Sequence, residues 1–147
     1  MKYVFLFSGQ GSQFKGMAED ICKEYPSARA VIDEMSRVSG EDIASFLWNT
    51  EPEELARSDR SQLAITAMQA AIITVLQEHS ITPTAAAGFS LGEFSALYAA
   101  KVLDLVTMTK LVALRGKIMQ KYCEQLDAQS KASGSGCGMA AVLKPAP

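Results

Sequence analysis

A serine flanked by glycines is the residue in this chain best suited to covalent chemistry. Residues 88–92 are Gly-Phe-Ser-Leu-Gly, which fits the G-x-S-x-G pattern of a nucleophile elbow. A sharp strand-to-helix turn would hold the hydroxyl of Ser90 at the positive end of the following helix, where the backbone amide of Leu91 can donate to a developing oxyanion. The alternative is a glycine-rich turn that contains a serine by coincidence, because the pattern alone is short.

A second glycine-rich segment can supply another oxyanion donor. Residues 8–13 are Ser-Gly-Gln-Gly-Ser-Gln and follow an apolar run, so they lie at the end of a predicted strand, where open α/β sheets bind ligands. The glycines beside Gln10 let its backbone amide approach a substrate closely. A phosphate-binding turn or a plain loop is the alternative. The segment lacks the Lys-Ser/Thr pair of a phosphate loop and the spacing of a dinucleotide fingerprint.

One arginine could bind a carboxylate. Arg115 begins the segment 115–120, Arg-Gly-Lys-Ile-Met-Gln, within a predicted helix. A guanidinium can hold a carboxylate through two parallel hydrogen bonds. The alternative is a cation on the solvated face of that helix.

The predicted secondary structure places both glycine motifs at strand ends. Short apolar runs at 3–8 and 85–88 predict buried parallel strands, each followed by glycine and then by helix. Thr50 and Pro52 predict an N-cap and a first-turn proline. The predicted helices cover residues 17–25, 27–39, 42–48, a short segment after Pro52, 61–78, 91–100 and 107–125. This order predicts an α/β fold, although two strands form too small a sheet to be stable alone.

Composition excludes several classes of function. The chain has 147 residues, and its 14 basic and 16 acidic residues are scattered, so we expect no nucleic acid partner. No run approaches the roughly 20 apolar residues that span a bilayer, and no signal segment is evident, so we expect no membrane association and a cytoplasmic location. The three cysteines have neither CxxC nor Cys/His spacing, which favours reduced thiols and predicts no metal site.

Three motifs together resemble a known family. The segments 9–13, 88–93 and 115–120 occur in the order and at the approximate separations seen in malonyl-CoA:acyl-carrier-protein transacylases and the acyltransferase domains of polyketide synthases. The resemblance extends over nearly the whole chain and corresponds to the N-terminal half of such an enzyme. Three spaced motifs are far more specific than a single elbow.

The resemblance implies a role for each motif residue. Ser90 would take the malonyl group from coenzyme A and pass it to the pantetheine thiol of acyl carrier protein, in fatty acid biosynthesis. Gln10 and Leu91 would form the oxyanion hole, and Arg115 would hold the malonyl carboxylate. Gln62 and Phe89 would line the site. No cofactor is implied, because coenzyme A enters as a thioester substrate.

Two departures from the family's pattern bear on activity. The residue before the nucleophile is commonly histidine in the family, but here it is Phe89, which cannot carry a proton. The catalytic histidine of the family has no counterpart among these 147 residues, and His79 ends a predicted helix, where a histidine commonly caps carbonyls. We therefore expect the chain alone to be nearly inactive, and a complementary C-terminal segment or chain to be a partner.

The resemblance also implies a division of the chain. Residues 1–126 would form an incomplete α/β-hydrolase-like large subdomain, 127–137 a linker, and 138–147 the start of a small ferredoxin-like subdomain whose first strand covers 138–143. Two other hypotheses stay open at this stage. One is a catalytically silent fragment or binding module, and the other is a serine hydrolase that uses the same elbow.

Overall fold

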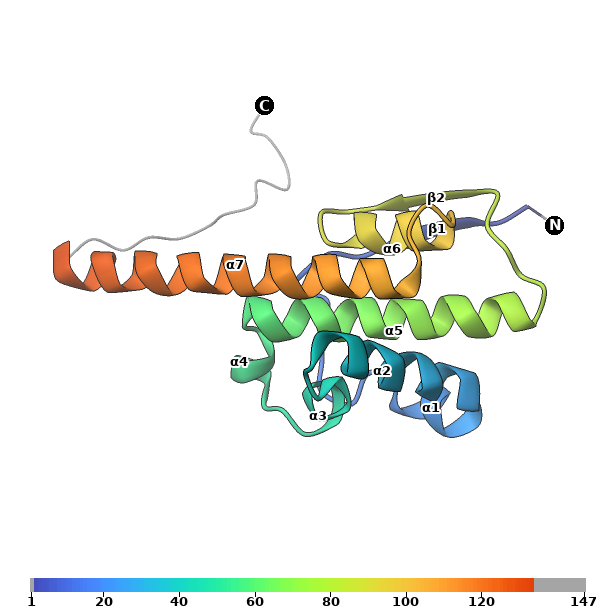
Figure 1. The fold of residues 1–147 in the computed structure, drawn as a ribbon, viewed down its shortest axis with the longest axis horizontal. Helices are drawn as coiled ribbons and strands as arrows, with labels where there is room; N and C mark the ends of the chain where they lie inside the picture. Colours follow the sequence, from blue (N-terminus) through green and yellow to red (C-terminus); the bar gives the residue numbers. More distant parts are fainter. Residues whose placement is uncertain (1, 134–147) are drawn as a thin grey trace, which may run out of the picture.

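The computed structural model describes residues 2–133, which form two strands and seven helices (Figure 1). Their order is β1 (Val4–Phe7), α1 (Glu19–Glu24), α2 (Pro26–Ser39), α3 (Ile43–Trp48), α4 (Pro52–Leu55), α5 (Ser58–Glu78), β2 (Ala85–Gly88), α6 (Gly92–Ala99) and α7 (Leu105–Ser133). The predicted α/β class is thus confirmed, with helix predominating in the described part of the chain.

The sheet consists of β1 and β2, which pair in parallel with Val4 opposite Ala85 and Phe7 opposite Gly88. Parallel pairing places the two carboxyl ends, and the two glycine motifs that follow them, at one edge. The sequence predicted buried strands, but only one face of this sheet is covered. Val4 and Leu6 are 63% and 78% exposed, because the described helices pack against the other face.

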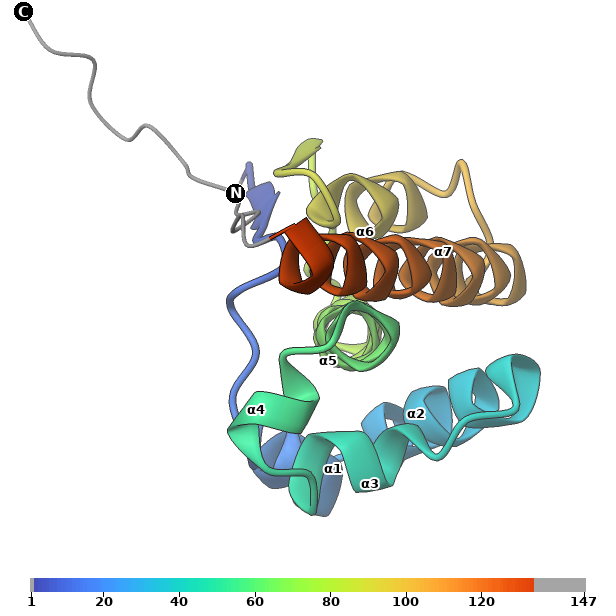
Figure 2. The same ribbon diagram turned by 90° about the vertical axis from the view of Figure 1, so that its left-hand side faces the viewer.

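Helix α5 lies at the centre of the molecule (Figure 2). Helices α1 to α4 form a layer on one side of it, and α7, α6 and the sheet lie on the other side. Its apolar residues fill several faces, since Leu63, Ile65 and Ala70 are all fully buried. A helix that is apolar nearly all round must be surrounded by other elements, so the prediction of a central helix is confirmed.

Two helix starts differ in how they are capped. Asp42 caps α3, because its carboxylate accepts a hydrogen bond from the Ser45 amide at 2.9 Å. The prediction of Thr50 as a cap was wrong. Glu51 is the N-cap residue of α4 without a side-chain cap, and the Thr50 hydroxyl instead donates to the carbonyl of Ser45 at 3.0 Å. The same carbonyl also accepts the Asn49 amide at 2.9 Å, so Thr50 adds a second hydrogen bond at the end of α3.

The final helix is longer than the sequence predicted. α7 was expected to end near residue 125, but it continues to Ser133 and extends past the start of α5 (Figure 1). The small and polar residues after 126, read as a linker, are therefore helical up to Ser133, because they contain no glycine or proline before residue 134. The predicted strand at 138–143 lies outside the described residues.

Candidate active site

Ser90 occupies a strained turn between β2 and α6. Its φ is 52°, a left-handed conformation that is uncommon for a residue with a side chain. The Phe89 amide donates to the carbonyl of Phe7 at 3.0 Å, which continues the β1–β2 ladder up to the turn. The serine hydroxyl is therefore held at the exposed carboxyl edge of the sheet by backbone geometry, as a nucleophile elbow requires.

The glycines of both motifs allow the backbones to approach closely. A Cβ on Gly88 would lie 2.1 Å from the carbonyl carbon of Gly92, and a Cβ on Gly92 would lie 2.3 Å from the carbonyl oxygen of Phe7. A Cβ on Gly9 would lie 2.7 Å from the carbonyl oxygen of Phe89. These distances are shorter than any normal contact, so only glycine fits at these three positions.

The expected oxyanion donors lie on the two neighbouring loops. Leu91 is the N-cap residue of α6 and is fully buried, so its amide lies at the start of a helix, where amides lack intrahelical partners. Gln10 follows Gly9, which packs against the Phe89 carbonyl. The next residue, Gly11, has a φ of 105°, a conformation that glycine adopts without strain. Both candidate amides thus flank the turn that carries Ser90.

Arg115 reaches the same turn from α7. Its Nη2 lies 3.3 Å from the Oγ of Ser90, and its Nη1 donates to the Oε1 of Gln62 at 2.7 Å. Its guanidinium also lies 5.9 Å from the centre of the Phe94 ring. The tertiary structure therefore brings together Ser90 and Arg115, which are 25 residues apart in the sequence, and places a cation beside the hydroxyl.

A pair of glutamines links this arginine to the first loop. Gln62 is fully buried, and its Nε2 donates to the side-chain Oε1 of Gln10 at 3.2 Å and to the sulfur of Met119 at 3.2 Å. The Nε2 of Gln10 in turn donates to the hydroxyl of Ser58 at 3.1 Å. The buried amide of Gln62 therefore has partners, as buried polar groups require, whereas Gln10 is an exposed residue.

Sequence reasoning missed a second buried glutamine. The Nε2 of Gln69 donates to the carbonyl of Ser8 at 3.0 Å, and the hydroxyl of Ser95 donates to its Oε1 at 2.6 Å. Gln69 thus links the residue that follows β1 to α6 by hydrogen bonds, and so connects the Gln10 loop to the helix that follows Ser90. The available signal was its spacing, because Gln62 and Gln69 are seven residues apart and share one face of an apolar helix.

An open hollow of about 360 Å³ adjoins Arg115. It is mainly apolar, and its lining comes from α6 and α7: Phe94, Leu111, Leu114, Arg115, Ile118 and Met119. Phe89, expected to line the site, is next to Ser90 in the chain, and the residue is 77% exposed. An apolar surface therefore borders a single cation near the serine.

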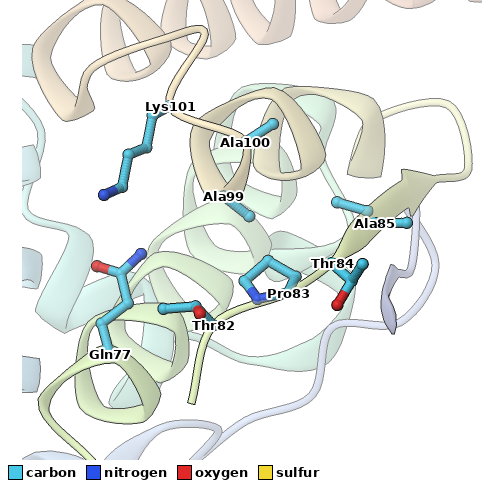
Figure 3. A pocket seen from close by; sticks show the side chains of 9 residues that line it. Gln77, Thr82, Pro83, Thr84, Ala85, Ala99, Ala100 and Lys101 are labelled. Atoms are coloured by element: carbon cyan, nitrogen blue, oxygen red, sulfur yellow. The ribbon is translucent and has the colours of Figure 1, made fainter. Parts of the chain in front are cut away.

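A separate hollow of about 410 Å³ lies at the amino end of β2, away from Ser90 (Figure 3). Thr82, Pro83, Thr84 and Ala85 line it from the strand side, and Lys101 lies across from them. Among its lining residues Lys101 is the only charged side chain. The hollow lies at the opposite edge of the sheet from the glycine motifs, where parallel α/β sheets do not usually bind ligands.

Neither histidine nor metal chemistry is evident around Ser90 in residues 2–133. His79 ends α5, where its amide donates to the carbonyl of Val75 at 3.2 Å and its ring meets that of Tyr25 edge to face. Gln62, beside Arg115, is 17 residues earlier on the same helix, which corresponds to about 25 Å along the axis. Within the described part of the chain, no group of three or more His, Cys, Asp or Glu side chains could hold a metal ion.

The cysteines of the described residues take no part in the site. Cys22 and Cys123 are free thiols, and burial raises the pKa of the Cys22 thiol above its usual value. A raised pKa keeps the thiol protonated and unreactive.

Fold and site together define an α/β protein with a serine elbow that faces an arginine. The chain belongs to the acyl transferase domain family, whose match covers residues 4–139. It is 40% identical over 122 residues to the malonyl CoA-acyl carrier protein transacylase of Haemophilus influenzae, and 36% identical over 120 residues to that of Bacillus subtilis. These matches cover 82% of this chain but only 39% and 38% of the two relatives, so the chain spans about 40% of their length.

A solved structure supports the same assignment. The chain superposes with a TM-score of 0.77 and 38% identity on a structure described as a type II polyketide synthase acyl-carrier protein in complex with its malonyl-transacylase. The superposition covers 82% of this chain and 40% of that one. Among residues 2–133, no helix is both long enough and apolar enough to cross a membrane.

Proposed function

We propose that this chain carries the nucleophile and the carboxylate-binding arginine of a malonyl-CoA:acyl-carrier-protein transacylase of fatty acid biosynthesis. The observation that carries the proposal is the position of Arg115, whose guanidinium lies 3.3 Å from the hydroxyl of Ser90. A malonyl group has a carboxylate two bonds from its thioester carbon. A cation beside the nucleophile is therefore the feature that distinguishes a malonyl site from an acetyl site.

The proposed reaction has two acyl transfers. The Oγ of Ser90 attacks the thioester carbonyl of malonyl-CoA, the carbon–sulfur bond breaks, and coenzyme A leaves as a thiol after it gains a proton. The pantetheine thiol of acyl carrier protein then attacks the malonyl-serine ester, and the serine hydroxyl regains its proton. No oxidation or reduction takes place, and coenzyme A acts as a substrate carrier rather than a bound cofactor.

Two backbone amides would stabilise the tetrahedral intermediates. Gln10 and Leu91 lie on the loops that flank Ser90, at the edge of the sheet where the charge develops. Amides fixed by such close backbone packing need no reorganisation during the reaction, and one oxyanion donor typically contributes about 10²-fold or more to the rate. Gly9 and Gly92 permit this packing, which supports the proposal.

Ser90 also needs a general base. His79 is about 25 Å along α5 from Gln62, the residue that contacts Arg115 beside Ser90, so it is not placed to accept the proton. We infer that the base comes from a complementary C-terminal segment or chain. The family resemblance suggests that residues 1–126 belong to a large α/β-hydrolase-like subdomain and that a linker at 127–137 leads to a small ferredoxin-like subdomain from residue 138. The exposed face of β1 and β2 is consistent with an incomplete sheet.

The experiment is intact mass spectrometry after brief incubation with malonyl-CoA, with Ser90→Ala as the control. It is run on the chain alone and with the complementary C-terminal part of a transacylase added. A malonyl adduct that the control lacks, and that acyl carrier protein removes faster than water, supports the transferase. Removal by water at the same rate would instead indicate a serine hydrolase. Folded protein that forms no adduct under either condition would leave a catalytically silent fragment.

A further inference from the structure

We infer that Ser58 is a positioning residue that fixes Arg115 opposite Ser90 by joining the Gln10 loop to helix α7. The inference rests on the proposed transacylase function, since it concerns how the carboxylate-binding arginine is held. Ser58 is the first residue of α5, only 6% exposed, and it contacts neither Ser90 nor Arg115 through a hydrogen bond of its own. Its effect on the site is therefore indirect.

Three contacts converge on this serine. Its hydroxyl accepts a hydrogen bond from the side-chain Nε2 of Gln10 at 3.1 Å. Its backbone amide lies at the start of a helix and so has no partner within that helix; it donates instead to the Oε1 of Gln120 at 2.9 Å. Its carbonyl oxygen faces Gly116, where an added Cβ would lie only 2.7 Å away. We call Ser58, Gln10, Gly116 and Gln120 the Ser58 junction.

The junction accounts for the spacing of the segment 115–120. Gly116 and Gln120 are one helical turn apart and both contact Ser58, whereas Arg115 and Met119 are one turn apart and both contact Gln62. The two pairs thus have different roles. Gly116 and Gln120 fix the position of α7 along its axis and its rotation against the start of α5. Arg115 and Met119 lie on the neighbouring face, which carries the guanidinium to the site.

The direction of each hydrogen bond in the chain from Arg115 through Gln62 and Gln10 to Ser58 follows from the arginine. A guanidinium can only donate, so Gln62 must present its oxygen to Arg115 and its Nε2 to Gln10. Gln10 must then present its own Nε2 to the hydroxyl of Ser58. Because each amide has a single allowed orientation, loss of the final acceptor at Ser58 removes the one hydrogen bond that ties the side chain of the exposed Gln10 to helix α5.

The expected consequence is a change in acyl selectivity. If the Ser58 hydroxyl is removed, Gln10 and Gln62 relax and the guanidinium loses its fixed position beside Ser90. Binding of the malonyl carboxylate depends on that position, but attack on a thioester does not. Transfer of malonyl should therefore fall relative to transfer of acetyl, whereas a purely structural defect would lower both equally.

The test compares Ser58→Ala, Ser58→Thr and Ser61→Ala in the full 147-residue chain. Ser61 is the matched control, because it is a buried serine in the first turn of α5 whose hydroxyl donates only to the carbonyl of Arg57, at 2.9 Å. The first measurement is the NMR signal of the Arg115 Nε–H group, assigned by its loss in Arg115→Lys. The second is the ratio of malonyl to acetyl adducts on Ser90 from an equal mixture of the two coenzyme A thioesters, with the complementary segment present.

We expect Ser58→Ala to shift the Arg115 signal and to lower the malonyl-to-acetyl ratio about fivefold, the effect of one net hydrogen bond. Ser58→Thr should restore both values, and Ser61→Ala should change neither. If Ser58→Ala does not fold, Gln120→Met removes the acceptor of the Ser58 amide from a half-buried position, and the same changes are expected.

The inference is overturned if Ser58→Ala matches Ser61→Ala in both measurements. Failure of the proposed function gives a different result. In that case the wild-type chain forms no adduct on Ser90, while the Arg115 signal still reports whether the Ser58 junction positions the guanidinium.

Discussion

The guanidinium of Arg115 lies 3.3 Å from the hydroxyl oxygen of Ser90, and its Nη1 donates a hydrogen bond to the Oε1 of Gln62 at 2.7 Å. Since arginine can only donate, the serine oxygen accepts this contact and its proton remains available to a base. The same Nη2 carries a second N–H group, which is available to a substrate carboxylate beside the hydroxyl. The contact therefore marks the place where a dicarboxylic acyl group is expected to be recognised.

Replacement of Arg115 by alanine should abolish the preference for malonyl over acetyl. Loss of a charged, bidentate hydrogen bond to the carboxylate is expected to lower the malonyl-to-acetyl ratio about 100-fold. Arg115→Lys keeps the charge but not the fork, so it should retain only part of the preference. Competition labelling of Ser90 with both thioesters measures this. An unchanged ratio in Arg115→Ala would rule out a carboxylate-binding role.

Gly116→Ala should destabilise the protein although alanine favours helix. In a helix interior this change normally stabilises by roughly 0.5–1 kcal/mol. Here the new Cβ would lie 2.7 Å from the carbonyl oxygen of Ser58, so we expect the free energy of unfolding to fall by about 1–3 kcal/mol. Urea unfolding provides the measurement.

Ala128→Gly, at an exposed position of the same helix, isolates the effect of propensity. A more stable Gly116→Ala protein would show that α5 and α7 do not approach as closely as described.

Gly92→Ala should damage the elbow more severely. The added Cβ would lie 2.3 Å from the carbonyl oxygen of Phe7, a backbone atom that cannot move without breaking the β1–β2 pairing. We expect a loss of at least about 3 kcal/mol in the free energy of unfolding, or failure to fold. Circular dichroism and urea unfolding would show it, and a wild-type unfolding curve for Gly92→Ala would contradict the described turn.

Asp104 should stabilise α7 in a pH-dependent way. Its carboxylate accepts the Thr107 amide at 2.6 Å, and this hydrogen bond lowers the pKa of the Asp104 carboxyl. A lowered pKa in the folded state gives a stabilisation that is present above the ordinary aspartate pKa and lost as the pH falls through the lowered value. Asp104→Ala should therefore lower the urea midpoint at pH 7 and have a smaller effect near pH 3. An equal effect at both pH values would exclude the charged cap.

The open face of the sheet should promote self-association of the isolated chain. Leu6 is 78% exposed on a strand whose outer edge has no partner within the described residues. Leu6→Lys is expected to reduce association in sedimentation velocity experiments. Val102→Lys, at a 67% exposed apolar residue in the α6–α7 connection, is the control and should have less effect. A monomeric wild-type chain at high concentration would contradict this expectation.

The sequence by itself predicted most of the helices and strands and the glycine-flanked turn at Ser90, whose role as a nucleophile stays a prediction. Glycine spacing around Ser90 and Gln10 is a local property, because the turns they form depend on neighbouring residues. The periodicity of α5 was equally clear, since a helix surrounded by others needs apolar residues on most faces. The end of α7 was placed too early, because small polar residues weaken a helix signal without terminating the helix.

Only the tertiary structure decided which distant residues meet. Arg115 could equally have been a solvated cation, and nothing local distinguishes the two cases. Its contact with Ser90 depends on how α7 packs against α5, and that packing includes the contacts of Gly116 and Gln120 with Ser58. Buried glutamines such as Gln62 and Gln69 acquire their roles in the same way. The partner of a buried amide is fixed by three-dimensional packing, which a single sequence does not specify.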